Sequence, residues 1–317
     1  MSEEILKRGG LRDEVYERLV QLLRRGPADG GLVVFDFDNT CILGDIGELF
    51  SHYLIDEMLY RFDLPAFWEL VDPADGRAEL REIATEAAKI PREERRGHET
   101  YEVYLAEMGA LYGRRYKRAG ARDCYEWAVR LHVGMRPEEI RAWTGEAIRR
   151  EIARTVEVER RRTEAGEEVE IGRGIRVLQE MRGLVGAFQR REFDVWIVSA
   201  TNLWSVQVFA EYYGVGRDRV LGNRVSDRDG VLTGEAQTPV LYREGKVAII
   251  EEVIGKTPLF VAGDSVTDLE MLREARELAM VVDVGNQVLR EEGSARGWAF
   301  QPQRELTTTQ ELTRSAR

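Results

Sequence analysis

Several residue types are scarce in this 317-residue chain, and each shortage excludes a class of protein. The chain has two cysteines, Cys41 and Cys124, and three scattered histidines, which is too few for a disulfide framework and does not indicate a zinc site. No apolar run approaches the about 20 residues that cross a bilayer. The N-terminus, Met1–Glu4, is acidic and unlike a secretory signal peptide. We therefore expect a cytoplasmic protein without a membrane partner.

Positive charge does not predominate either, because 57 acidic residues outnumber 46 basic ones, the net charge is -11 and the isoelectric point is near 5.1. Such a chain is repelled by polyphosphate backbones and anionic lipids, so nucleic acid is not an expected partner. Lysine is rare, with five against 41 arginines, so the position of each lysine is informative. The length allows one large domain or two smaller ones. The oligomeric state stays open, and a homo-oligomer is one of the alternatives.

The most informative stretch is Asp36-Phe37-Asp38-Asn39-Thr40, directly after the apolar run Leu32–Phe35. A short run of branched and aromatic residues after Gly30-Gly31 is typical of a parallel strand buried on both faces. Ligands of such sheets bind just beyond the carboxyl ends of the strands. Two aspartates there need a metal or hydrogen bonds to offset their burial. The alternative is a capping aspartate followed by a turn asparagine.

Polar side chains follow two more predicted strands and open one predicted helix. These are Ser199 and Thr201 after Val195–Val198, Asp264 and Asp268 after Pro258–Ala262, and Lys246 before the helical stretch Val247–Ile254. Each also has an ordinary structural explanation. Ser199 fits a helix N-cap, Lys246 a solvated side chain, and Asp268 a first-turn acid favoured by the helix dipole.

Taken in order, Asp-x-Asp-x-Thr, Ser, Lys and Gly-Asp-x-x-x-Asp resembles the motif set of the haloacid dehalogenase superfamily, and specifically its phosphatases. The resemblance implies that Asp36 is a nucleophile that forms an aspartyl-phosphate and that Asp38 is the general acid and base. It implies that Ser199 and Lys246 hold the transferring phosphoryl group, with Thr201 binding substrate. Superfamily members that dehalogenate usually lack the second aspartate, and the ion-pumping ATPases carry Lys and Thr after the nucleophile. Neither pattern occurs in this chain.

The same resemblance implies a magnesium ion. Asp264 would join Asp36 and the backbone carbonyl of Asp38 as ligands, while Asp268 supports this site and Lys246 from behind. Chemistry favours these roles independently, because a carboxylate that attacks an anionic phosphate monoester is repelled unless cations offset the charge. Magnesium prefers oxygen ligands and keeps several waters, so two carboxylates and a carbonyl suffice.

Within the superfamily the chain looks most like the phosphoserine phosphatase branch, through Val220–Val225 and Asp229–Glu235. Asn39, Ala200-Thr201 and Thr267 depart from that family, and the first motif is closer to phosphorylcholine phosphatases, so both substrates stay open. Asp45 stands where the phosphoserine enzymes carry an acid that contacts the substrate amine. The alternative for Asp45 is a helix N-cap, with Glu48 completing a capping-box-like pair.

The order of the predicted elements indicates an α/β fold. Strands alternating with helices predict a Rossmann-like, doubly wound parallel sheet from residues 1–41 and 171–317, with a hairpin across residues 227–230. Residues 42–170 show helical spacing only, so we expect an inserted all-α cap domain over the site, with residues 157–170 as a solvated helix face.

These features predict a magnesium-dependent phosphomonoester hydrolase acting on a small, amine-bearing metabolite such as a phosphoserine- or phosphocholine-like compound. Two alternatives remain at this stage. A phosphomutase of the same superfamily would use the same Asp36 chemistry and return the phosphoryl group. A catalytically inactive relative would bind phosphorylated ligands as a sensor or scaffold.

Overall fold

The computed structural model describes residues 5–27 and 31–312. The acidic N-terminus Met1–Glu4, Gly30 and residues 313–317 of the polar tail lie outside the described residues. The chain groups into two compact units. The first comprises the residues up to Ile46, 175–222 and those from Pro239 onward, and the second comprises 47–174 and 223–238. Across the described ranges, no helix is both long and apolar enough to span a bilayer.

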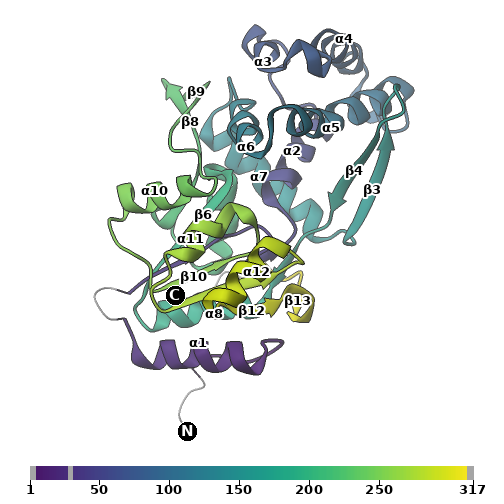
Figure 1. The fold of residues 1–317 in the computed structure, drawn as a ribbon. Helices are drawn as coiled ribbons and strands as arrows, with labels where there is room; N and C mark the ends of the chain where they lie inside the picture. The colour runs from purple at the N-terminus through teal and green to yellow at the C-terminus, as the bar shows by residue number, and fades with distance from the viewer. Residues whose placement is uncertain (1–4, 28–30, 313–317) are drawn as a thin grey trace. The chain divides into compact units, whose positions relative to one another are not determined.

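A six-stranded sheet forms the centre of the first unit (Figure 1). Its strands, in spatial order, are β12 (Ala299–Pro302), β11 (Leu278–Asp283), β10 (Phe260–Gly263), β1 (Leu32–Phe35), β6 (Asp194–Asn202) and β7 (Val220–Asn223). The pairings from β12 through to β6 are all parallel. The predicted α/β fold with a parallel sheet is therefore confirmed, and each predicted sheet strand overlaps an observed one.

Apolar side chains cover both faces of this sheet, as its continuous hydrophobic strands require. On one face, Val34 and Val261 pack with side chains of α10 (Glu244–Val253), α11 (Leu269–Arg273) and α12 (Gln287–Arg296). On the other, Phe188 of α8 (Gln179–Arg190) lies against Phe35 and Phe260, with ring centroids 6.1 and 5.1 Å away. Further helices of this unit are α1 (Asp13–Arg25) and α9 (Leu203–Ala210). The sheet is thus wound on both sides.

The strand order reverses beside β1, because the chain continues from β1 to β6 on one side and later returns to β10 on the other. The carboxyl ends of β1 and β10 are tied together where the backbone N–H of Asp36 donates to the Ala262 carbonyl at 2.9 Å. Such a switch point is where ligands bind in open α/β sheets. The first and last predicted motifs therefore meet at the expected place.

The second unit is mostly helical. Its helices are α2 (Ile46–Asp56), α3 (Pro65–Leu70), α4 (Arg77–Ala88), α5 (Glu99–Ala119), α6 (Ala121–Arg130) and α7 (Pro137–Ile152). It also contains two antiparallel hairpins, β3 (Glu157–Arg162) with β4 (Glu168–Arg173) and β8 (Val225–Arg228) with β9 (Val231–Ala236). The helices agree with the helical spacing seen in the sequence.

The prediction of a helix over residues 157–170, within an all-helical insert, is wrong. Strands β3 and β4 occupy this stretch. β3 lacks the apolar alternation that usually indicates a strand, because the less exposed positions are Glu159 and Arg161 rather than apolar residues. β4 does alternate, with Val169 and Ile171 buried. The inward face of β3 is stabilised by charge pairs, which a search for hydrophobic periodicity does not detect.

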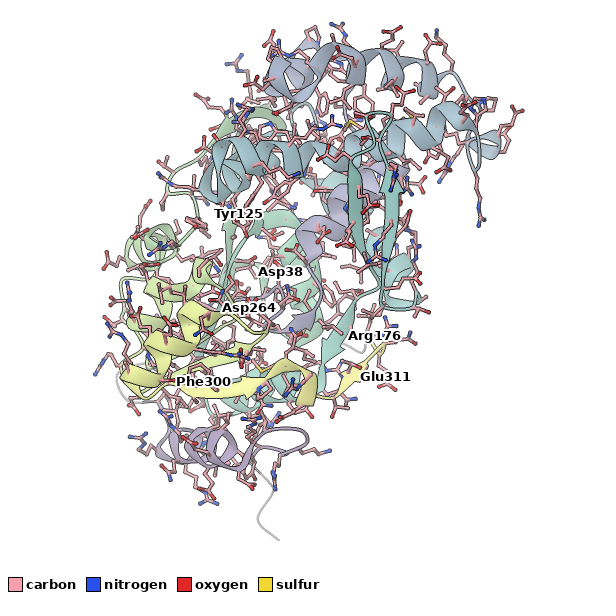
Figure 2. The ribbon with its side chains drawn as sticks, turned by 45° about the vertical axis from the view of Figure 1, so that its right-hand side comes forward. Asp38, Tyr125, Arg176, Asp264, Phe300 and Glu311 are labelled. Carbon is pink, nitrogen blue, oxygen red and sulfur yellow. The ribbon has the colours of Figure 1, made fainter. Side chains whose placement is uncertain are left out.

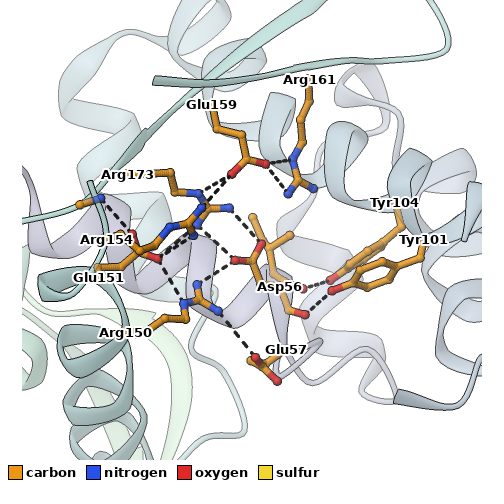
Figure 3. A network of polar contacts seen from close by, with 12 residues as sticks. Asp56, Glu57, Tyr101, Tyr104, Arg150, Glu151, Arg154, Glu159, Arg161 and Arg173 are labelled. Carbon is orange, nitrogen blue, oxygen red and sulfur yellow. Dashed lines mark hydrogen bonds and ion pairs between the residues drawn. The ribbon is translucent and has the colours of Figure 1, made fainter. Parts of the chain in front are cut away.

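Those charge pairs belong to a buried network that joins four elements of the second unit (Figure 3). Arg173 of β4 is 3% exposed and lies 2.7 Å from Glu159 of β3 and 3.2 Å from Asp56 of α2, measured between nitrogen and oxygen. Glu151 of α7 accepts the Gly174 N–H at 3.0 Å. Burial opposes ionisation of Glu159, but hydrogen bonding to Arg173 and the charge of Arg161 lower its pKa to about 2. Glu159 therefore stays ionised beside Arg173 at neutral pH.

The predicted hairpin at residues 227–230 is confirmed. Asp229 and Gly230 both have positive φ, 55° and 75°, as a type I′ turn requires. The hairpin is held within the second unit by backbone bonds to the residues that follow α6. Leu232 exchanges hydrogen bonds with Gly134 (2.8 Å) and Met135 (2.9 Å).

Candidate active site

The predicted site residues of the first unit gather beyond the carboxyl ends of β1, β6 and β10. Asp36 and Asp38 follow β1 directly, Ser199 and Thr201 lie near the end of β6, and Asp264 follows β10. Asp38 and Asp264 lie near one another in the stick view (Figure 2). Asp36 is 5% exposed and Asp264 7%, so the site presents carboxylates that are largely withdrawn from water.

Lys246 lies at the centre of this group. It is the third residue of α10 and is fully buried, so the solvated-lysine alternative is wrong. Its Nζ donates to Asp36 Oδ1 at 2.7 Å and to Asp268 Oδ1 at 2.5 Å. Burial opposes its charge, but these two carboxylates raise the Lys246 pKa above its ordinary value. The ammonium is therefore fixed beside the proposed nucleophile.

Asp268 is fully buried and its hydrogen-bonding capacity is used on both oxygens. Oδ1 binds Lys246, while Oδ2 accepts the backbone N–H groups of Asp264 (3.1 Å) and Ser265 (3.2 Å). The Ser265 contact belongs to a capping box, so Asp268 closes the first turn after Asp264 as well as binding Lys246. The backbone approaches closely here, since a Cβ on Gly263 would lie 2.7 Å from the Asp268 side chain. Asp268 thus fixes Lys246 and the Asp264 loop together.

Asp38 is held separately by β6 and the start of α2. Its Oδ2 accepts the hydroxyls of Thr201 (2.9 Å) and Ser199 (3.2 Å), and its Oδ1 accepts the Ile46 N–H at 2.7 Å. Ser199 is not a helix N-cap, because Asn202 caps α9. Burial, followed by the charges of Asp45 and Asp36, raises the Asp38 pKa well above its ordinary value. A raised pKa suits a group that must give and take a proton.

The turn between Asp38 and Asp45 is tightly closed. Asn39 has a left-handed φ of 54°, donates its N–H to the Gly44 carbonyl (3.0 Å), and accepts the Gly44 N–H on its side chain (3.2 Å). Asp45 follows, half-buried, and its charge contributes to the raised pKa of Asp38. It is Asp38 that accepts the first N–H of α2, at Ile46. Glu48 binds His52 (3.7 Å) and the Gly172 N–H (3.4 Å).

The acidic groups fit a divalent cation. Oxygen atoms of Asp36, Asp264 and Asp268 all lie within 4.8 Å of one another, and all three residues are buried. Lys246 offsets only part of this charge. Burial, with repulsion from Asp268, raises the Asp36 pKa to about 6, and burial with repulsion from Asp36 raises that of Asp264 well above its ordinary value. A hard cation with oxygen ligands would relieve this repulsion.

Two neighbouring residues acquire contacts that the sequence did not indicate. Thr40, the last residue of the first motif, donates its hydroxyl to Asp264 Oδ1 at 3.3 Å. Cys41 is fully buried and its thiol donates to the Asp36 carbonyl at 3.3 Å, while burial raises its pKa well above the ordinary value. A buried thiol whose pKa is raised is poorly suited to act as a nucleophile. The sequence shows Thr40 as the last residue of the motif, but it does not show that Asp264 is its hydrogen-bond partner.

Comparison with known proteins supports the same family. The family model described as haloacid dehalogenase-like hydrolase matches residues 33–273. No match was found among curated proteins. A solved structure of a conserved protein of unknown function from Anaerococcus prevotii DSM 20548 is 22% identical, with 99% of each chain covered and a TM-score of 0.84. One from Bordetella pertussis Tohama I, also of unknown function, is 20% identical over 86% of this chain and 98% of that chain, with a TM-score of 0.54.

The family match spans every motif from β1 to α11, and the fold and the order of the motifs agree with the resemblance inferred from the sequence. The two solved structures share the fold. This chain therefore belongs to the haloacid dehalogenase-like hydrolase family.

Proposed function

We propose that the protein is a magnesium-dependent phosphomonoester hydrolase that works through an aspartyl-phosphate on Asp36. The observation that carries the proposal is the buried contact of Lys246 with Asp36 at 2.7 Å, beside a second carboxylate, Asp38, held by a different set of donors. Burial raises the pKa of both carboxylates, but the charge of Lys246 opposes that rise at Asp36, whereas the charges of Asp45 and Asp36 add to it at Asp38. That difference is what a nucleophile and a general acid at the same site need.

The reaction divides into two displacements at phosphorus. In the first, an Asp36 oxygen bonds to phosphorus, the bond from phosphorus to the leaving oxygen breaks, and Asp38 gives that oxygen its proton. In the second, Asp38 takes a proton from water as the water oxygen bonds to phosphorus and the bond to Asp36 breaks. Lys246 would hold the nonbridging oxygens, where negative charge must be stabilised, and the Ser199 hydroxyl would join it by turning its single proton from Asp38 to the phosphoryl group.

Asp36, Asp264 and the backbone carbonyl of Asp38 are the proposed magnesium ligands. Asp268 is the less suitable of the clustered acids, because Lys246 and two backbone N–H groups already occupy its oxygens. When bound, magnesium would supply positive charge that lets a carboxylate approach a phosphate dianion.

For the substrate we propose a small, amine-bearing phosphomonoester, with Asp45 as the counter-charge and the second unit as a cap that selects it. Aromatic residues of that unit contribute packing rather than a cation site. Tyr60, Phe67, Trp68, Tyr101 and Tyr104 are all buried. Tyr53 already has a cation partner, since the Arg150 guanidinium lies 4.9 Å from its ring centroid.

A phosphate-release screen over small phosphomonoesters, with and without magnesium, tests the proposal. The wild type should release phosphate only with a divalent ion, and Asp36→Asn should neither turn over nor trap a beryllium or aluminium fluoride adduct. Asp36→Asn activity near that of the wild type rules out the mechanism. A phosphomutase would instead move phosphate to a second acceptor, and an inactive relative would bind phosphorylated ligands without releasing phosphate.

A further inference from the structure

A backbone turn directly before α10 positions Lys246 in the site, and one residue of this turn has an unfavourable backbone conformation. The turn runs from Tyr242 to Gly245, closed by the Gly245 N–H to the Tyr242 carbonyl at 3.0 Å. Its second residue, Arg243, has φ 53° and ψ -116°, the first central position of a type II′ turn. Glycine is the residue that this position favours, so an arginine there is strained. Strain of this kind persists only where surrounding contacts hold the backbone.

Those contacts come from the loop and helix that follow Asp264. The Arg243 N–H donates to the Thr267 carbonyl at 2.9 Å. The Arg243 guanidinium binds both carboxylate oxygens of Glu270 in α11, with Nη2 to Oε1 at 2.6 Å and Nε to Oε2 at 3.1 Å. Glu270 is largely buried, with a side chain 12% exposed. A paired fork of this type fixes geometry as well as charge.

Both ends of this contact adjoin site residues. The Lys246 N–H donates to the Arg243 carbonyl at 2.9 Å, and Glu270 stands two residues after Asp268, which binds Lys246 Nζ. The turn also packs closely against the preceding loop, because a Cβ on Gly245 would lie 1.8 Å from the Val240 carbonyl oxygen, so this position requires glycine. The helix carrying Lys246 is thus tied to the segment carrying Asp268 by a backbone bond and a side-chain fork, as well as by the lysine itself.

We propose that Arg243 and Glu270 are positioning residues that hold Lys246 in register with the phosphoryl group. This inference rests on the proposed function, since it assigns Lys246 to that group. The Arg243 side chain bonds to Glu270, so it acts on Lys246 through the turn rather than by direct contact with the ammonium. Misplacing the ammonium by about 1 Å would cost on the order of 10- to 100-fold in rate.

Kinetics of Arg243→Ala, Glu270→Ala and the double variant test this. Each single variant should lower kcat/KM for p-nitrophenyl phosphate by about tenfold or more and weaken inhibition by inorganic phosphate. The double variant should lose no more than the worse single one, because one contact is removed in all three. Glu270 also contacts Arg273 at 3.3 Å. Comparing the single variants with the double variant separates the effect of the Arg243 contact from that of the Arg273 contact.

Two conservative variants distinguish positioning from folding. Arg243→Gly suits the turn, so its melting temperature should be at least that of Arg243→Ala, yet its kcat/KM should fall as much. Arg243→Lys keeps the charge but not the fork, and should not restore activity. The matched control is Arg290→Ala, which breaks the ion pair of Arg290 with Asp283 at 2.8 Å. The Asp283 side chain is 12% exposed, as is that of Glu270, and this variant should keep wild-type kinetics.

Three results would each overturn the positioning role. They are a kcat/KM within about twofold of the wild type in the single variants, losses in kcat/KM that multiply in the double variant, and full activity in Arg243→Gly or Arg243→Lys. If the wild type releases phosphate and Asp36→Asn does not, those outcomes leave the proposed function intact. A wild type that releases no phosphate from any ester overturns both.

Discussion

Thr201 Oγ1 donates a hydrogen bond to Asp38 Oδ2 across 2.9 Å. The family resemblance implied that Thr201 binds substrate, but in the structure it contacts the proposed general acid. With Ser199 on the same oxygen and the Ile46 N–H on the other, the plane of the Asp38 carboxylate is fixed by three donors. The direction in which Asp38 can deliver a proton is therefore set by β6 and α2 before substrate binds.

Replacing Thr201 should impair proton delivery selectively. In Thr201→Val the hydroxyl is lost, and kcat for an alkyl phosphate should fall by about tenfold or more, within the range general acids contribute. The loss on p-nitrophenyl phosphate should be smaller, because p-nitrophenolate leaves without needing a proton. Thr201→Ser keeps the donor and serves as the control. Equal losses on both esters would place Thr201 in phosphoryl binding instead.

Asp264 and Asp268 should differ in their response to magnesium. Asp268→Asn, one contact away from the metal, should raise the magnesium concentration for half-maximal rate by roughly 10- to 100-fold. Asp264→Asn removes a proposed ligand and should raise that concentration further. Without magnesium the two substitutions should change the melting temperature in opposite directions. Asp264→Asn relieves repulsion between carboxylates and keeps or raises it, whereas Asp268→Asn removes one of the two carboxylates that bind Lys246 and lowers it. Thermal denaturation with and without magnesium checks both. Full wild-type activity in EDTA contradicts the assignment.

Asp45 should govern selectivity rather than the reaction itself. A counter-charge at contact distance is worth on the order of 1 to 4 kcal/mol, depending on the local dielectric, and so about tenfold or more in specificity. Asp45→Asn should lose preference for amine-bearing phosphomonoesters and still hydrolyse p-nitrophenyl phosphate. Equal loss on both substrates with unchanged melting temperature would assign Asp45 to the reaction centre, and equal loss with lowered stability would leave it as a structural residue.

Acid should destabilise the protein through His132, which is buried against Phe50 with ring centroids 5.6 Å apart. Burial lowers its pKa from 6.5 to about 4. Because the unfolded state binds the proton first, the stabilisation is present above pH 6.5 and is lost as pH falls toward 4, reaching on the order of 2 to 3 kcal/mol. Urea unfolding at about pH 7 and about pH 4.5 should show a steeper loss in the wild type than in His132→Gln. Parallel losses would refute the role.

The parts of the site that the sequence predicted are those that depend on where strands end. Asp36, Asp38 and Asp264 follow continuous apolar runs, and parallel strands bring such ends to one edge of a sheet. Nothing more than hydrophobic pattern and motif order was needed to place them.

What the sequence did not predict depends on partners far along the chain. Residues 157–170 were expected to be helical because the stretch is rich in charge, and Arg173, the buried partner of Glu159, lies on another strand. Thr201 and Ser199 acquire their contacts with Asp38 only once β6 is paired with β1. The strained Arg243 carries no local signal, because a non-glycine residue at that turn position is the unfavoured choice.

The second unit is built from two separate stretches of chain, with β8 and β9 bonded to residues that precede them by about a hundred positions. During synthesis, this unit has all its residues once the ribosome has passed Thr238. At that moment β10, α10 and α11 do not yet exist, so Asp36 has neither Lys246 nor Asp264 beside it. The second unit can therefore be complete before the active site exists, and Asp36 and Asp264, whose carboxylates repel one another, come together only afterwards.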